Sequence, residues 1–166
     1  QVSKQTVYSH FANKDELFRE CIMSKCREYG LDMAGHAPDL PIEDALTGLG
    51  YRFLGLLDDE QVISMHRVLL SETQAFPSLA KSFWETGPQA AMQALSQYLI
   101  ANSEHGMSDI SDPDAAASDF LLLVEGHYMK RRMMLDAASL SPAERDTRVS
   151  ESVHKVRRLY DRSYQQ

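Results

Sequence analysis

The stretch of sequence that decides the fold is residues 1–18, QVSKQTVYSHFANKDELF. Ser3 is a favoured helix N-cap residue, so we expect a short helix to begin there and run over residues 4–10. Asn13 is a second cap residue, and Glu16 follows it at the three-residue spacing of a capping box. The stretch therefore predicts a short helix, a turn, and the start of a longer helix.

The side chains expected to face outward on the short helix suit the major groove of DNA. Gln5 can pair with adenine, Lys4 can pair with guanine, and the carbon atoms of a threonine or tyrosine can contact the methyl group of thymine. His10 and Lys14 suit phosphates, which fix the position of a protein on DNA rather than its sequence preference. A polar surface turn before a capped helix explains the same composition equally well.

The segments VSKQTVYSHF (residues 2–11) and NKDELF (residues 13–18) resemble the recognition helix and the following helix of the tetracycline-repressor (TetR) family of transcriptional regulators. This resemblance implies a partial helix-turn-helix domain over residues 1–30, with its recognition helix at 3–10 and a linker helix from 14. It implies a ligand-binding and dimerisation domain over residues 31–166. The DNA-contacting residues that it implies are Ser3, Lys4, Gln5, Thr6, Tyr8, Ser9, His10 and Lys14.

A helix-turn-helix needs a first helix that braces the recognition helix. The sequence begins at the recognition helix, so we expect the first helices to be missing and a chain starting at Gln1 to bind DNA poorly.

Length and charge set limits on the class of protein. The chain has 166 residues and 43% hydrophobic content, which is enough for one or two domains with a core. Its net charge of −7 argues against a protein that coats nucleic acid broadly. Residues 1–14, however, contain two lysines and no acidic residue, which fits a protein that contacts DNA at one end.

The cysteines and the hydropathy indicate a cytoplasmic protein. Cys21 and Cys26 are the two cysteines, and on one helix they would lie on diverging faces, where a disulfide is poorly placed. We expect both to be small core residues in a reducing compartment. No apolar run approaches the roughly 18 residues of a membrane span, so we expect no membrane association.

Apolar residues recur at helical spacing along the chain, without the alternation of strands, and predict an all-α fold. We expect helices over residues 14–36, 42–57, 62–73, 77–99, 113–138 and 142–160. Within these, a kink is expected at Pro88, and Asp58 is expected to form a capping pair with Gln61. Residues 71–80 and 83–88 are similar to the C-terminal domain of the AefR-like branch of TetR regulators.

The middle helices contain many methionines and aromatic residues, a pattern found more often in plain cores than in pockets. The family resemblance implies an effector cavity between these helices, and we expect a small, mainly apolar effector. Tyr98 and Glu125 are expected near it as polar groups. The predicted ligand-binding residues are Phe53, Met65, His66, Leu69, Phe83, Trp84, Met92, Leu95, Phe120, Leu123 and His127.

The last two helices carry more apolar residues than one buried face needs. The resemblance implies that they form a four-helix bundle with a second copy of the chain. Such a homodimer would read two half-sites of a near-palindromic operator. The predicted interface residues are Leu121, Val124, Tyr128, Val149, Val153, Val156 and Tyr160.

Motifs of catalysis are missing from the sequence. It contains no nucleophile elbow, P-loop, glycine-rich dinucleotide turn or histidine pair at metal-ligand spacing. We therefore predict no enzymatic activity, no catalytic residue, no cofactor and no metal. The leading interpretation is a TetR-like repressor released from its operator by a small effector. The alternative is a helical small-molecule- or metal-binding protein, or an enzyme, that does not bind DNA.

Overall fold

The computed structural model describes residues 13–33 and 36–164 of the chain. Over this part the secondary structure is helical, and no strand occurs apart from an isolated antiparallel bridge between Ile110 and Asp161. The all-α prediction is confirmed. No helix within the described part is both long enough and apolar enough to cross a membrane.

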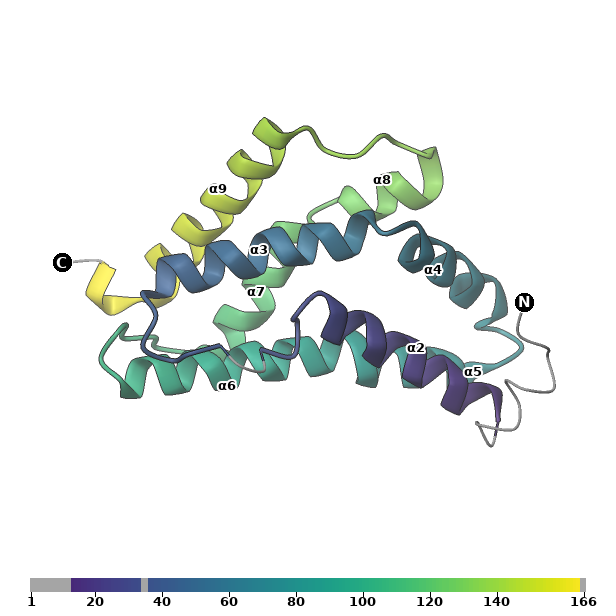
Figure 1. Cartoon of the computed structure of the whole chain (residues 1–166), viewed down its shortest axis with the longest axis horizontal. Coiled ribbons are helices and arrows are strands. Elements are labelled where there is room, and N and C mark those ends of the chain that lie inside the picture. Colours follow the sequence, from purple (N-terminus) through teal and green to yellow (C-terminus); the bar gives the residue numbers. More distant parts are fainter. Residues whose placement is uncertain (1–12, 34–35, 165–166) are drawn as a thin grey trace.

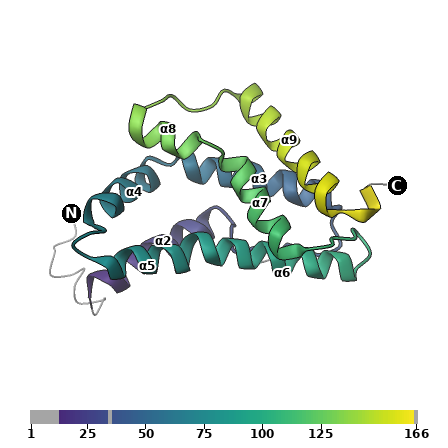
Figure 2. The same cartoon turned by 180° about the vertical axis from the view of Figure 1, so that it is seen from behind.

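The helices form an elongated bundle in which α2 lies along α5 and α3 runs through the middle (Figure 1). Seen from behind, α7 crosses α3 on its way from α6 to α8 (Figure 2). Their bounds are α2 Lys14–Glu28, α3 Ile42–Asp58, α4 Glu60–Glu72, α5 Pro77–Trp84, η1 Glu85–Gln89, α6 Ala90–Glu104, α7 Pro113–Glu125, α8 Tyr128–Leu135, α9 Pro142–Tyr160 and η2 Arg162–Tyr164.

The hydrophobic core lies where α3, α6, α7 and α9 meet. Leu54, Leu99, Phe120 and Val149 have no exposed surface there, and burying each such side chain contributes roughly 1.5–3 kcal/mol. α3 and α9 approach closely at Gly50, where an added Cβ would lie 2.9 Å from Val149 Cγ1. This core fixes the frame around which the other helices are arranged.

The predicted helix over residues 14–36 is too long, because α2 ends at Glu28. Gly30 has φ +61°, and its N–H donates to the carbonyl of Arg27 at 3.0 Å. A left-handed glycine after the last turn is a common way to end a helix. Met33 continues the helical spacing of apolar residues, but it lies in the loop after α2, and its side chain is buried there.

The predicted helix over residues 113–138 is also wrong, because the chain breaks at Gly126 between α7 and α8. Gly126 has φ +52°, and an added Cβ would lie 2.5 Å from Arg148 Nη1. That nitrogen donates to the backbone oxygen of Glu125 at 3.2 Å. The arginine thus satisfies a carbonyl left open at the end of α7, and it needs the space that glycine leaves.

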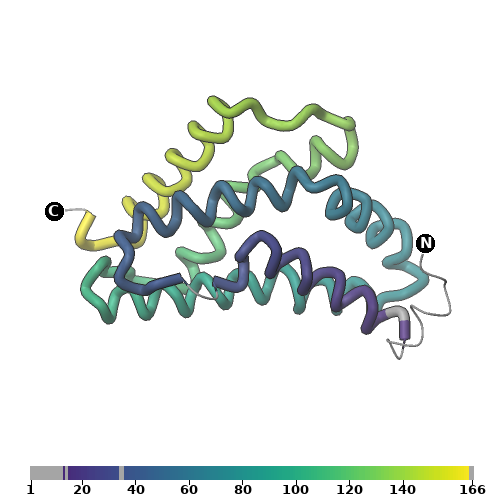
Figure 3. The backbone as a smooth tube through the Cα atoms, viewed as in Figure 1, coloured from purple at the N-terminus to yellow at the C-terminus, as the bar shows by residue number. Residues whose placement is uncertain are grey.

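At Pro88 the structure shows a π-type turn, η1, between α5 and α6. Proline lacks an N–H and cannot continue an α-helical ladder, and the wider turn carries the backbone past it. Figure 3 shows the chain passing from α5 into α6 without an intervening loop. The expected disturbance is therefore local.

Two predicted helix starts are confirmed. Asp112 Oδ1 accepts from Ala115 N–H at 3.0 Å at the start of α7. Ser141 and Glu144 form a reciprocal capping box at the start of α9. Local side-chain chemistry therefore determines where both helices begin.

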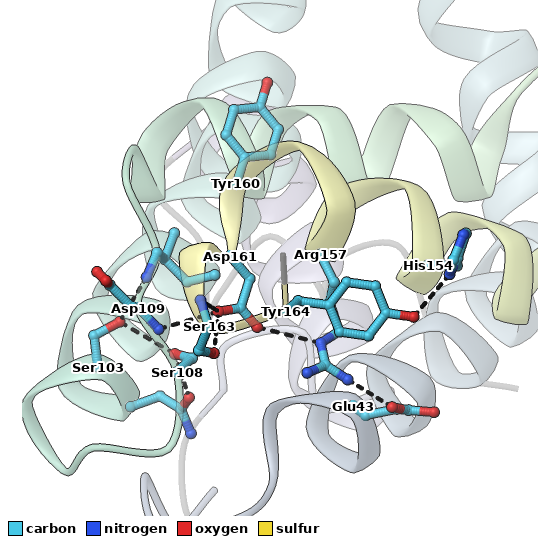
Figure 4. Close-up of polar contacts among 12 residues, drawn as sticks. Glu43, Ser103, Ser108, Asp109, His154, Arg157, Tyr160, Asp161, Ser163 and Tyr164 are labelled. Carbon is cyan, nitrogen blue, oxygen red and sulfur yellow. Dashed lines mark hydrogen bonds and ion pairs between the residues drawn. The ribbon is translucent and has the colours of Figure 1, made fainter. Parts of the chain in front are cut away.

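The C-terminal end of α9 is fixed by a buried carboxylate (Figure 4). Asp161 is fully buried and accepts from Asp109 N–H at 3.2 Å and from the Ser163 hydroxyl at 2.5 Å. Arg157 joins it at 3.3 Å and also reaches Glu43 of α3 at 2.6 Å. Burial opposes ionisation of Asp161, but these donors outweigh it and hold its pKa below the ordinary value. The cluster ties α9 to the α6–α7 loop and to α3.

Candidate functional site

A largely apolar cavity of about 280 Å³ lies between the inner faces of helices α2 to α8. Residues that are far apart in the sequence line it, from Ile22 of α2 to Met129 of α8. Trp84 and Leu122 line it while remaining 54% and 63% exposed, so they border its opening to solvent. The cavity has the size and lining of a site for a small apolar molecule.

The structure brings part of the predicted ligand-binding set together at this cavity. Phe53, Met65, His66, Phe83, Trp84 and Met92 line it. Leu69, Leu95 and Phe120 are instead buried away from it, Leu123 lies in a groove beside α9, and His127 is exposed in the turn between α7 and α8. Whether the lining residues bind a ligand stays a prediction.

Sequence reasoning missed the contribution of α2 to the cavity. Ile22, Lys25 and Cys26 line it, and α2 comes close to η1 because Gly87 has no side chain. A Cβ on Gly87 would lie 3.3 Å from Ile22 Cγ2. The helical spacing of Ile22 and Cys26 was the available signal, but it did not show which neighbour they face. Cys21, also expected in the core, is exposed.

Lys25 joins the cavity to the junction of α3 and α4. Its Nζ donates to Asp59 Oδ2 at 2.7 Å and lies 3.0 Å from Glu28 Oε2, and these bonds raise its pKa. The Tyr29 hydroxyl donates to the same Asp59 oxygen at 3.1 Å. Asp59 also caps α4 by accepting from Gln61 N–H at 2.8 Å, so the cap expected at Asp58 lies one residue later.

Asp58 takes part in a different network on the other side of this junction. Its carboxylate accepts hydrogen bonds from the Tyr128 hydroxyl and from Arg145. Arg132, a buried arginine of α8, has its Nε 3.7 Å from Asp58 Oδ1. The adjacent aspartates therefore connect α2 on one side with α8 and α9 on the other.

The other polar groups of the cavity differ in their partners. His66 Nδ1 lies 2.8 Å from the carbonyl oxygen of Val62, so this nitrogen carries the hydrogen; burial lowers the pKa of the ring and keeps it neutral. Burial raises the pKa of the Cys26 thiol and of the Glu125 carboxyl. Tyr98, expected here, donates instead to Ala37 O at 3.2 Å, outside the cavity.

Comparison with known proteins identifies the family. The family model for the C-terminal domain of AefR-like transcriptional repressors matches residues 44–162, which is most of the chain. The chain belongs to the TetR family of transcriptional regulators. A comparison with curated proteins gave no match.

Solved structures of TetR-family regulators share the fold. A protein from Mesorhizobium loti MAFF303099, described as a TetR-family regulator, superimposes with a TM-score of 0.78 at 24% identity, over 96% of this chain and 81% of that one. The Flavonoid-responsive Regulator FrrA superimposes with a TM-score of 0.71 at 25% identity, over 97% of this chain and 82% of that one. A TetR-family regulator from Pseudomonas syringae pv. tomato str. DC3000 superimposes with a TM-score of 0.70 at 24% identity, over 97% of this chain and 81% of that one.

TetR-family regulators are transcription factors that bind operator DNA, and they are not enzymes, which agrees with the prediction that this chain has no enzymatic activity. The predicted recognition helix, with Ser3, Lys4, Gln5, Thr6, Tyr8, Ser9 and His10, lies outside the described residues. Lys14 is the first residue of α2. The N-cap residue of α2 is Asn13, whose Oδ1 accepts a hydrogen bond from Glu16 N–H at 2.8 Å.

TetR-family regulators also dimerise, but the apolar residues predicted for the interface face the chain's own core. Leu121, Val124, Tyr128, Val149, Val153 and Val156 are buried within the single chain, and Tyr160 is half-buried with its hydroxyl 2.5 Å from Asp119 Oδ2. The residues of α7 and α9 are buried because these helices pack against each other and against α3, and Tyr128 of α8 donates a hydrogen bond to Asp58 of α3. The large apolar side chains exposed on these two helices are Leu122 and Leu159.

Within the described residues, histidine, cysteine and carboxylate side chains form no group of three or more that could hold a metal ion.

Proposed function

We propose that this TetR-family protein is a repressor that a small, mainly apolar effector releases from its operator. The proposed division of labour places DNA reading in residues 1–30 and ligand binding and dimerisation in residues 31–166. DNA contacts come from the recognition helix at residues 3–10 and from Lys14. The protein acts as a homodimer, so that each copy reads one half of a near-palindromic site.

The observation that supports this proposal is that α2 forms a wall of the cavity. Ile22, Lys25 and Cys26 line the cavity, while the first residue of α2, Lys14, follows the predicted DNA-reading segment. A helix of 15 residues is a rod of about 22 Å, so a displacement at its cavity end moves its other end as well. Effector binding and the placement of the recognition helix are thereby connected by one rigid element.

The proposed mechanism is a shift between two conformations of the dimer. One conformation spaces the two recognition helices for successive major grooves, and the effector binds the other more tightly. A ligand with equal affinity for both would leave DNA binding unchanged. The similarity to a regulator named as flavonoid-responsive supports a response to a small aromatic molecule.

A thermal-shift screen with small aromatic compounds tests the ligand-binding part. A compound that binds the native state raises the melting temperature in proportion to the logarithm of its concentration once the site is saturated. Ala91→Met, which adds bulk inside the cavity, should abolish the rise, whereas Ala101→Met at the far end of α6 should leave it unchanged. A library in which no compound raises the melting temperature contradicts the proposal.

Two substitutions test the DNA-binding part by measurement of operator affinity. Lys14→Ala should weaken binding to all duplexes and reduce the salt dependence by about one released counterion. Gln5→Ala should relax base preference at a cost of roughly 1–3 kcal/mol on the selected operator. Unchanged operator affinity in both variants contradicts the assignment of this helix.

A further inference from the structure

Glu125 occupies a position at which burial and the end of a helix disfavour a negative charge. It is the last residue of α7, and a helix C-terminus disfavours a carboxylate. Its side chain is half-buried at the apolar cavity, and burial raises its pKa, while the charge of Lys130 lowers it. No hydrogen bond or ion pair joins the carboxylate to any residue in the described ranges 13–33 and 36–164.

The other polar groups of the cavity already have partners or carry no charge. Lys25 is bound to Asp59 and Glu28. His66 is neutral and uses its Nδ1 hydrogen on a backbone carbonyl. The Cys26 thiol is held neutral by burial, and Ser118 contributes an exposed hydroxyl. Glu125 is therefore the charged group of this lining that is left without a bonded partner.

We infer that Glu125 is the specificity-determining residue of the cavity and that it receives a positively charged amine attached to the apolar body of the effector. This inference rests on the proposed function and adds the chemical class of the ligand. An ammonium–carboxylate hydrogen bond is stronger than a neutral one, and more so against an apolar cavity wall than in bulk water. The amine also supplies the partner that the buried carboxylate lacks, which offsets the cost of its desolvation.

Three probes of equal length separate the head group from the apolar body: phenylbutylamine, phenylbutanol and phenylbutanoate. Their affinities for the protein are measured by calorimetry at neutral pH, where their heads are positive, neutral and negative. We expect the amine to bind at least about tenfold more tightly than the alcohol, and the carboxylate to bind most weakly. The carboxylate is disfavoured because Lys25 is already neutralised by its own acidic partners.

Glu125→Gln keeps the size of the side chain and removes its charge. In this variant the amine should lose its advantage over the alcohol, while the affinity of the alcohol should stay the same. The control Glu104→Gln removes a carboxylate from the exposed end of α6 and should keep the full preference for the amine. Ala91→Met should weaken amine and alcohol alike, which shows that both probes occupy the cavity.

The outcomes separate the inference from the proposed function. If the alcohol or the carboxylate binds the wild type as tightly as the amine, and Ala91→Met blocks it, the cavity is a ligand site but the assignment of Glu125 is wrong. The assignment is equally wrong if Glu125→Gln keeps the preference for the amine. If none of the three probes binds, both the effector site and its amine specificity are contradicted.

Discussion

Asp59→Asn removes one negative charge at the junction of α2, α3 and α4 and should destabilise the protein by roughly 2 kcal/mol. The carboxylate accepts from Lys25 and Tyr29, and the Lys25 and Asp59 side chains are 19% and 12% exposed, so solvent screens the pair only partly. Hydrogen bonds to charged groups contribute about 1.5–3 kcal/mol, and exposed ion pairs contribute about 0–1. The estimate lies in the lower half of the range for charged hydrogen bonds, because Lys25 keeps Glu28 as a partner.

Asparagine is as good an N-cap as aspartate, so the variant keeps the cap of α4. The loss of stability therefore reports on the hydrogen bonds from Lys25 and Tyr29 to Asp59. Urea denaturation of wild type and variant at equal protein concentration measures it, and the melting temperature should fall by about 4–8 °C. Glu28→Gln is the control, because Glu28 pairs with the same lysine but is 56% exposed. This substitution should lower the free energy of unfolding by less than about 0.5 kcal/mol.

The pH dependence gives a second check on Asp59→Asn. Burial opposes ionisation of Asp59, but Lys25, Gln61 N–H and Tyr29 outweigh it, so its folded pKa lies below the ordinary value of about 4. Its stabilisation is complete above the unfolded pKa and is lost as pH falls through the folded pKa. The difference in the free energy of unfolding between wild type and variant should therefore be constant near pH 7 and shrink below about pH 4. A difference in unfolding free energy under about 0.5 kcal/mol at pH 7, or one that persists in strong acid, contradicts the stabilising role of the Asp59 carboxylate.

Three more tests concern a glycine at a helix end, the carboxylate at the cavity and the proposed dimer. Gly126→Ala should cost about 1–3 kcal/mol in denaturant unfolding, because φ is +52° and the new Cβ would meet Arg148 Nη1; the matched control Gly106→Ala has φ +72° but open space, so it should cost less. Glu125→Gln should be more stable than wild type at neutral pH, and this advantage should disappear as pH falls below about 4, because a raised folded pKa makes the wild type lose stability as pH rises. Sedimentation at micromolar concentration should give twice the chain mass of 18.8 kDa, and a mass of 18.8 kDa contradicts the dimer.

The starts of α7 and α9 were predictable from the sequence, but the ends of α2 and α7 were not. Asp112 and Ser141 act through side chains three residues or fewer from the groups they cap, so the local sequence contains the whole signal. At Gly30 and Gly126 the apolar spacing continued past the true end. The residues beyond are buried too, but from a loop in one case and from a new helix in the other. Periodicity alone does not distinguish these cases from a continuing helix.

The lining of the cavity was predictable only in part, because helical spacing shows that a residue is buried and not what it is buried against; the dimer interface stays a prediction. Phe53 and Met65 line the cavity, whereas Phe120, of the same chemical type, fills the core under α9. Val149 and Val153 were predicted as interface residues because the last two helices carry more apolar residues than one buried face needs, and both side chains are buried within the single chain. Within the chain, α9 packs against both α7 and α3, and α3 is distant in sequence.

Operator affinity with and without a saturating cavity ligand tests the central claim most directly. The protein is bound to a duplex selected from random sequences, and fluorescence anisotropy measures the dissociation constant. The account predicts that the ligand weakens operator binding by about tenfold or more, and that Ala91→Met, which fills the cavity, makes the affinity independent of the ligand. An operator affinity that stays the same while the wild-type cavity is saturated contradicts the account.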